Sequence, residues 1–230
     1  SKKIEFGVSS MVSRLKTVGM LKPMEALKRA DPNKWHYGKA FDPSRIERNY
    51  FSFIKILNSL DVEILWMTPK NNENADSIFT YDPSFMTQKG AILLSPGKSL
   101  RKGEEKIHEE FYKNNNIPII GKLSESAIAE GGDMFWLDKE TLVIGKGFRT
   151  NQIAIEQITS MLSKINVEVV SFDLPFFLGR EACLHMMSLI SIVDEKKALA
   201  YFSLLPVGLV QLLEKRGYEL IEAPEDEFNS

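Results

Sequence analysis

The sequence predicts an α/β fold built from a repeated unit of strand, strand, helix and strand, and two observations support this prediction. First, four short apolar runs resemble one another and begin 55, 50 and 51 residues apart. Second, each run follows a helix-like stretch that ends at a polar or glycine break. A fixed period of this size indicates a repeated supersecondary unit. The runs are VEILWM from Val62, IPIIGK from Ile117, VEVVSF from Val167 and YELIEA from Tyr218.

A helix is expected before each of these runs. Asp42 and Pro43 form an N-cap and first-turn pair, and Thr150 is predicted to cap the third helix. The second helix is expected from about Gly103 to Tyr112, and Gly217 fits the end of the fourth. Apolar stripes at helical spacing define the buried faces. Their members are Ile46, Tyr50, Phe53, Ile54 and Leu57; Ile107 and Phe111; Ala154, Ile158, Met161 and Leu162; and Pro206, Leu209, Val210 and Leu213.

Strand-like runs stand before each of the later helices. They pair as IFTYDPSFMT with AILLSP, DMFWL with TLVIG, and CLHMMSLISIV with ALAYF, whereas the first unit has the single run RLKTVGML. Turn signals such as SPGKS and LDKET separate them. We therefore expect one domain over residues 1–230, with units at approximately 9–70, 76–123, 130–173 and 181–223.

The composition narrows the class of protein. The chain has 230 residues, of which 43% are hydrophobic and 26% charged, with a formal net charge of −2. This balance suits one large globular domain and gives no basic footprint for nucleic acid or for a membrane surface. No apolar run approaches the roughly 20 residues of a membrane helix, and SKKIEFGVSS lacks the apolar core of a secretory signal. The single cysteine excludes an internal disulfide, so a cytoplasmic setting is expected.

Several charged side chains stand where they could carry chemistry. Asp82 precedes a proline in an apolar run, which fits a turn or a carboxylate that grips a cation. Glu130 and Asp133 flank two glycines, which fits a tight turn or a close approach to a ligand. Arg101 and Arg149 precede helices, where positive charge is mildly unfavourable. They fit either a site for a substrate carboxylate or solvated positions on the surface.

Cys183 and His185 stand two residues apart in an apolar run predicted to be a strand. Their Cβ atoms would then lie roughly 6–7 Å apart on one face. That separation is too long for a nucleophile and base that share a hydrogen bond of about 3 Å. Cys183 is therefore expected to pack in the core. Taken alone, His185 fits a core histidine, and the three histidines and one cysteine match no metal-ligand spacing.

Five motifs occur in an order that resembles the guanidine-modifying enzymes, which include dimethylargininase, arginine deiminase and the amidinotransferases. The motifs are DSIFTYDP, SPGKSLRKGEE, EGGD, GFRTN and LHMMS, and the resemblance is strongest to dimethylargininase-like members. It covers about Asp76 to Asn229. The resemblance implies a five-bladed α/β propeller with five-fold pseudosymmetry, of which four repeats are present. It also implies that the nucleophile is a cysteine of a fifth repeat, expected after Ser230, and not Cys183.

The resemblance assigns catalytic roles to three residues. Asp82 would hold the guanidinium, and Asp76 would support it from the same loop. Glu130 would orient His185, and His185 would be the general acid and base. These residue types suit the chemistry, because carboxylates bind a guanidinium through forked hydrogen bonds and an imidazole can protonate a departing amine.

Further positions concern substrate binding. Arg101 and Arg149 match positions that bind the substrate's α-carboxylate in dimethylargininase-like members, and Asp133 is expected to line the same site. Tyr81 stands where dimethylargininases have an acid and deiminases an arginine. Met187 stands where deiminases have a second aspartate. These departures favour a methylated arginine or another small guanidino compound over peptidyl arginine.

The implied activity is that of a hydrolase that cleaves a C–N bond of a small free guanidino compound through a covalent cysteine intermediate. The products would be a ureido compound and an amine or ammonia. An amidinotransferase of the same fold is the nearest alternative, and a non-catalytic binding or scaffold propeller is the second. Neither a cofactor nor a metal is expected. The expected partners are arginine or a methylated arginine, with a homodimer as one form of assembly.

Overall fold

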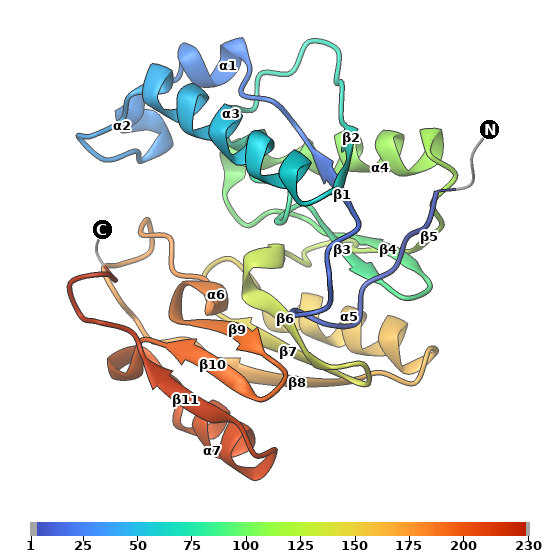
Figure 1. Cartoon of the computed structure of the whole chain (residues 1–230), viewed down its shortest axis with the longest axis vertical. Coiled ribbons are helices and arrows are strands. Elements are labelled where there is room, and N and C mark those ends of the chain that lie inside the picture. Colours follow the sequence, from blue (N-terminus) through green and yellow to red (C-terminus); the bar gives the residue numbers. More distant parts are fainter. Residues whose placement is uncertain (1–3, 229–230) are drawn as a thin grey trace.

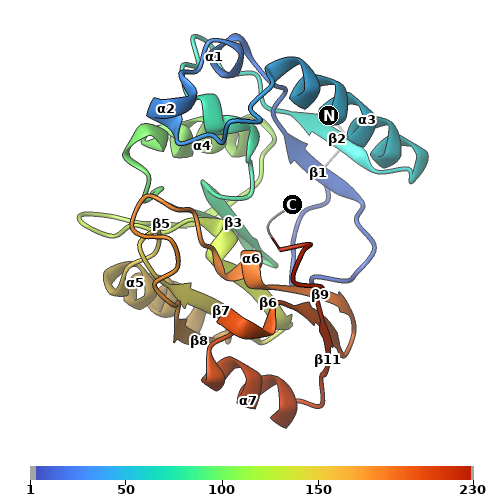
Figure 2. The ribbon, with the colours of Figure 1, turned by 90° about the vertical axis from the view of Figure 1, so that its left-hand side faces the viewer.

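The computed structural model describes residues 4–228, so Asn229, where the resemblance ends, lies outside the described part of the chain. Within it, the strands form one two-stranded and three three-stranded sheets in a mixed α/β fold. The first unit lies at the top and the fourth at the bottom, with the second and third units between them (Figures 1 and 2). The predicted α/β class is confirmed.

The first unit is a parallel pair of strands joined by three helices. Strand β1 (Thr17–Met20) pairs in parallel with β2 (Glu63–Trp66). The connection holds α1 (Glu25–Lys28), α2 (Pro32–Trp35) and the long α3 (Pro43–Ser59). Helix α3 begins where predicted because the side chain of Asp42 accepts hydrogen bonds from the amides of Ser44 and Arg45. Its predicted stripe is partly wrong, because Phe53 is 48% exposed.

The other three units share one topology. Two antiparallel strands are followed by a helix, and a third strand then runs parallel to the middle one. The four repeated apolar runs of the sequence contain β2 and these three third strands. The elements are β3 (Ser84–Thr87), β4 (Gly90–Leu93), α4 (Glu104–Asn114) and β5 (Ile119–Lys122); β6 (Met134–Asp138), β7 (Thr141–Lys146), α5 (Gln152–Ser163) and β8 (Glu168–Asp173); and β9 (Ile190–Asp194), β10 (Lys197–Ala200), α7 (Val207–Lys215) and β11 (Glu219–Glu222).

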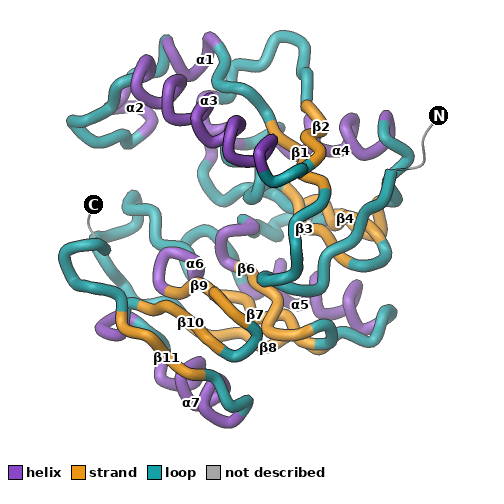
Figure 3. Tube along the Cα trace, viewed as in Figure 1, coloured by secondary structure: helices purple, strands orange, loops and turns teal. Residues whose placement is uncertain are grey.

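Helices α4, α5 and α7 lie toward the periphery, outside the strands (Figure 3). Helix α5 buries the predicted residues Ala154, Ile158 and Leu162 completely against the strands of the third unit. Helix α7 buries Leu209 and Leu213, also as predicted. The apolar contacts of each unit are thus made by its helix and strands, and the polar side chains discussed below come from the segments that precede the first strand of a unit. No helix in the described part of the chain has the length and apolar character needed to cross a membrane.

Three local predictions are wrong. Asn151, not Thr150, caps α5, because its side chain accepts a hydrogen bond from the amide of Ala154. In the run IFTYDPSFMT only Ser84–Thr87 is strand, because Ile78 ends the short 3-10 helix η1 (Ala75–Ile78) and residues 79–83 are loop. The run CLHMMSLISIV begins with loop and the single-turn helix α6 (Met186–Leu189), so only its end is strand.

Candidate active site

Three polar residues from three different units meet at one place. Asp82 precedes β3, Glu130 precedes β6 by way of the 3-10 helix η3 (Gly131–Asp133), and His185 precedes α6. One atom of each side chain that could bind a metal ion, a carboxylate oxygen or an imidazole nitrogen, lies within 4.8 Å of the other two. Among the described residues, these three could in principle hold a cation, although each already bonds to protein groups. The structure thus brings together the three residues predicted to be catalytic.

The start of helix α6 sets the position of His185. The amide of Met186 donates to Oδ1 of Asp133 over 3.0 Å, and the amide of His185 donates to Oγ of Ser188 over 3.1 Å. These bonds hold the imidazole so that its Nε2 lies 2.7 Å from Oε2 of Glu130. His185 is therefore presented from a helix N-terminus and not from the predicted strand.

The Glu130 and His185 side chains form an ion pair. Burial alone would lower the pKa of His185, but its hydrogen bonds with Cys183 and Glu130 and the charges of Asp133 and Asp82 raise it to about 11. Burial alone would raise the pKa of Glu130, but its bond to His185 and the charge of Arg149 lower it to about 2. The imidazole is thus an imidazolium at neutral pH, and the carboxyl is a carboxylate.

Glu130 is held from two further directions. Nη1 of Arg149 donates to both of its carboxylate oxygens, over 3.1 and 2.9 Å, and the backbone amide of Lys98 donates to Oε1 over 3.1 Å. Glu130 has no exposed surface, while 12% of the Arg149 side chain is exposed. Arg149 therefore lies beside the three meeting residues, with its charge partly committed to Glu130.

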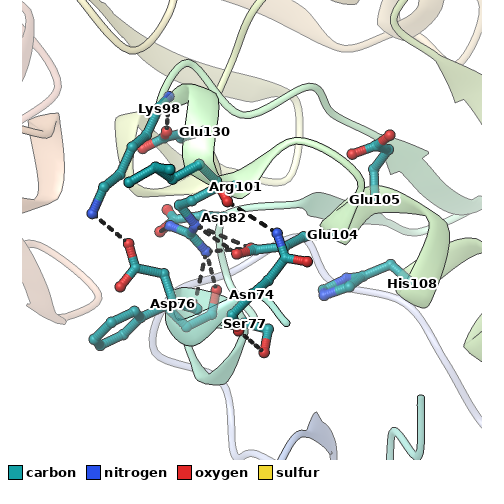
Figure 4. A network of polar contacts seen from close by, with 12 residues as sticks. Asn74, Asp76, Ser77, Asp82, Lys98, Arg101, Glu104, Glu105, His108 and Glu130 are labelled. Carbon is teal, nitrogen blue, oxygen red and sulfur yellow. Dashed lines mark hydrogen bonds and ion pairs between the residues drawn. The ribbon is translucent and has the colours of Figure 1, made fainter. Parts of the chain in front are cut away.

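The Asp82 carboxylate is held at both oxygens, one of them by Arg101 (Figure 4). Oδ1 of Asp82 accepts from the amide of Gly132 over 2.8 Å, and Oδ2 accepts from Nη1 of Arg101 over 2.6 Å. The Arg101 side chain is only 3% exposed and also pairs with Glu104. The Arg101 guanidinium is therefore engaged by Asp82 and Glu104, and its expected contact with a substrate carboxylate stays a prediction.

Two glycines allow this close packing. A Cβ atom on Gly132 would lie 2.6 Å from Nδ1 of His185 and 3.0 Å from Oδ1 of Asp82. A Cβ atom on Gly131 would lie 1.9 Å from the carbonyl oxygen of Tyr81. Real Cβ atoms do not make contacts this short, so only glycine fits at either position. The glycine pair correctly predicted a close approach, but the approaching atoms belong to Tyr81, Asp82 and His185 of the same protein.

Asp76 is tied to the segment that follows α2. Its Oδ2 lies 2.7 Å from Nζ of Lys98, and its Oδ1 accepts from the hydroxyl of Tyr37 over 2.5 Å. The Lys98 ammonium also donates to the backbone carbonyl of Trp35 over 2.8 Å. Sequence reasoning missed Lys98 and Tyr37, because their partner is distant in the chain and neither residue stands out by type or spacing.

Tyr81 and Asp133, both expected to bind substrate, differ in their exposure to solvent. Tyr81 is 45% exposed, and its hydroxyl donates to the carbonyl of Met134 over 3.2 Å. Asp133 has no exposed surface, and Oγ1 of Thr150 donates to it over 2.6 Å. Burial raises the pKa of Asp133 to about 6. Asp133 also accepts from the amide of Met186 and so supports the start of helix α6, while its expected place in the substrate site stays a prediction.

Cys183 is exposed, which contradicts the expected core position. Its Sγ lies 3.6 Å from Nδ1 of His185. The prediction that the two side chains stand too far apart depended on a strand, and the segment is a loop that leads into helix α6. The thiol and Glu130 therefore contact opposite nitrogens of the same imidazole.

Known proteins resemble this chain in sequence. Residues 39–230 match the family model described as N,N dimethylarginine dimethylhydrolase, eukaryotic. The chain is 30% identical over 174 residues to the uncharacterized protein YkgA of Bacillus subtilis, a match that covers 76% of this chain and 57% of that protein. It is 28% identical over 196 residues to N(G),N(G)-dimethylarginine dimethylaminohydrolase of Pseudomonas aeruginosa, covering 84% of this chain and 70% of that enzyme.

The fold is also shared with a solved structure. The structure of dimethylarginine dimethylaminohydrolase from Pseudomonas aeruginosa in complex with citrulline matches with a TM-score of 0.75 at 23% identity. That match covers 93% of this chain and 78% of the other. In length, the matched part of this chain covers 57% of YkgA and 70% of the Pseudomonas enzyme.

Proposed function

Because this chain belongs to the dimethylarginine dimethylhydrolase family, within the wider superfamily of guanidine-modifying enzymes, we propose that it is part of a hydrolase acting on a small free guanidino compound. Arginine or a methylated arginine is the proposed substrate. The enzyme would cleave one C–N bond, release ammonia or an amine and leave a ureido product. The proposal is carried by the meeting of Asp82, Glu130 and His185, whose carboxylate oxygens and imidazole nitrogen lie within 4.8 Å of one another.

The residue types at the site support this chemistry. A guanidinium is planar and cationic, and carboxylates such as that of Asp82 bind it through directed, charge-assisted hydrogen bonds. The His185 imidazolium is a proton donor in the right protonation state for a departing amine. Once it has given up that proton, the neutral imidazole can activate water. Glu130 would hold the ring in place and favour its charged form.

We further propose that the nucleophile is a cysteine thiolate supplied from outside Ser1–Ser230. It would attack the central carbon of the guanidinium, and water would then hydrolyse the resulting thiouronium-type intermediate. In the same proposal, the four sheets are four blades of a five-bladed α/β propeller. Cys183 is the alternative nucleophile within these residues, because its Sγ lies 3.6 Å from Nδ1 of His185.

Amidino transfer is the second candidate, because it would proceed through the same cysteine intermediate with an amine in place of water. The position of Arg149 beside the site supports a substrate with a carboxylate in either case, since 12% of its side chain remains exposed. The form of assembly and the cellular location stay predictions.

The test is turnover by the protein with its natural sequence on both sides of these 230 residues. Arginine and its methylated forms are supplied with and without an added amine, and citrulline, amine and amidino-transfer products are measured. His185→Ala should lower kcat by about 10² to 10⁴. His36→Ala, at a histidine side chain that is 47% exposed in the first unit, should leave turnover unchanged. Absence of all turnover in the wild-type protein would instead favour a binding or scaffold function.

A further inference from the structure

We propose that Glu104, acting through Arg101, is a positioning residue for the Asp82 carboxylate, an inference that rests on the proposed function. Figure 4 shows the three side chains in a row, with the Arg101 guanidinium between the two carboxylates. Asp82 comes from the segment before β3, and Glu104 from the first turn of α4. The row is almost fully buried, with side-chain exposures of 11% for Asp82, 3% for Arg101 and 1% for Glu104.

The two carboxylates use different edges of the guanidinium. Glu104 takes the edge made by Nε and Nη2, with contacts of 3.2, 3.0 and 2.8 Å. Asp82 meets only Nη1, over 2.6 Å. A carboxylate has about four lone-pair directions, and a guanidinium prefers to bind one through a two-nitrogen fork. By occupying the fork, Glu104 limits Arg101 to a single bond with Asp82.

This division leaves Asp82 able to bind a second guanidinium. One of its lone pairs faces Arg101 and one faces the amide of Gly132, which donates over 2.8 Å. Two directions remain for a substrate, about as many as a forked contact needs. If Arg101 turned its fork toward Asp82, both oxygens would be engaged by a resident cation and the bond to Gly132 would be strained.

Helix α4 holds Glu104 in place through a polar stripe on its inner face. Glu104, His108 and Tyr112 are spaced at four-residue intervals, and all are buried. Nδ1 of His108 and the hydroxyl of Tyr112 lie 2.7 and 2.6 Å from Oγ of Ser84, which is two residues after Asp82. The same helix thus contacts both the guanidinium and the start of the strand that follows Asp82.

Arg101 also ties the preceding loop to this row. Its Nη2 donates to the backbone carbonyls of Asp76 and Phe79, over 3.3 and 3.1 Å. The loop that carries Asp82 is therefore fastened at three points by one guanidinium.

The test replaces Glu104 by glutamine in the protein with its natural flanking sequence. Glutamine removes the negative charge, and its NH₂ group, which cannot accept, would replace either Oε1, 3.2 Å from the Nε donor, or Oε2, which accepts from both Nε and Nη2. We expect Arg101 to turn toward Asp82, the amide resonance of Gly132 to shift in a ¹H–¹⁵N spectrum, and kcat/KM to fall by about 10- to 100-fold. Glu110→Gln is the matched control, because Glu110 is an exposed acid of the same helix.

The two measurements separate this inference from the proposed function. An unshifted Gly132 resonance in Glu104→Gln would overturn the inference whether or not the wild-type protein turns over a guanidino compound. So would a shifted resonance with unchanged kcat/KM in an active enzyme. If wild-type turnover is absent, the proposed function fails, and the Gly132 resonance alone decides whether Glu104 positions Asp82. Should Glu104→Gln not fold, Glu104→Asp keeps the charge but withdraws the carboxylate by one methylene, and both readouts should move in the same direction.

Discussion

Replacing Glu130 by glutamine should lower the pKa of the His185 imidazole by about 3 units. The two side chains are 2.7 Å apart at Nε2 and Oε2, and Glu130 is fully buried. Because each charge is spread over its whole group, the two charge centres are taken as about 4 Å apart. At that distance two unit charges interact by about 4 kcal/mol at an effective dielectric constant of 20. One pKa unit corresponds to about 1.36 kcal/mol, so the loss amounts to about 3 units. From about 11 in the wild-type protein, the pKa of His185 should fall to about 8.

The assay is a titration of the imidazole ¹⁵N shifts. Because the wild-type pKa is raised, His185 should stay protonated throughout the neutral range, whereas the Glu130→Gln variant should lose this proton near pH 8. Turnover should follow the same course, since the imidazolium is the proposed acid: the variant's rate should decline above about pH 8 while the wild-type rate holds. Glu168→Gln, at an exposed position of β8, is the control. A His185 titration that is unchanged in Glu130→Gln would refute the proposed coupling.

Three further predictions concern groups around the site. Burial lowers the pKa of His108 to about 3, below its unfolded value near 6.5, so the stability that its neutral form contributes is complete above pH 6.5 and is lost as the pH falls toward 3. Urea unfolding at pH 7 and 5 should show a loss of about 2 kcal/mol from this group, and His108→Gln should remove it; an equal loss in the variant would contradict the assignment. Cys183→Ser should leave kcat within about twofold, whereas a loss of about a thousandfold or more would make this thiol the nucleophile. Gly132→Ala, whose Cβ would lie 2.6 Å from Nδ1 of His185, should lower kcat/KM by about 100-fold. Its control is Gly38→Ala, which meets no atom within 4 Å and should be silent in the same kinetic assay.

Local signals predicted the elements well because they act within a few residues. The Asp42 cap works through amides two and three residues ahead, and the α5 stripe follows from helical spacing. Thr150 failed as a cap for a reason that is not local. Its hydroxyl is taken by Asp133, and the neighbouring Asn151 supplies the oxygen that the helix needs. A choice between two adjacent cap residues depends on which of them the tertiary structure has already engaged.

For the site, the meeting of three residues was predicted, whereas the position of Cys183 was not. The resemblance named Asp82, Glu130 and His185, and the structure brings them together, but nothing in their spacing of 48 and 55 residues specified the contact. The Cys183 prediction failed because it assumed a strand, and an apolar run cannot by periodicity alone be told from a loop that leads into a short helix. The geometry of that loop depends on the bond between Met186 and Asp133, which joins two units.

The charges around the site lead to one more conclusion about how a guanidinium would bind. Among the described residues, Asp76 is paired with Lys98, Asp82 with Arg101, and Glu130 with Arg149 and His185. A cationic substrate would therefore meet carboxylates whose charge is already largely balanced. Its affinity would depend less on net charge than on the lone-pair directions that remain open, and a buried carboxylate offers those directions only while its resident partner is held to one edge. On this argument the cations around the site would set the geometry that a planar, forked ligand must match, and we predict that Arg101 and its partner Glu104 affect specificity through Asp82.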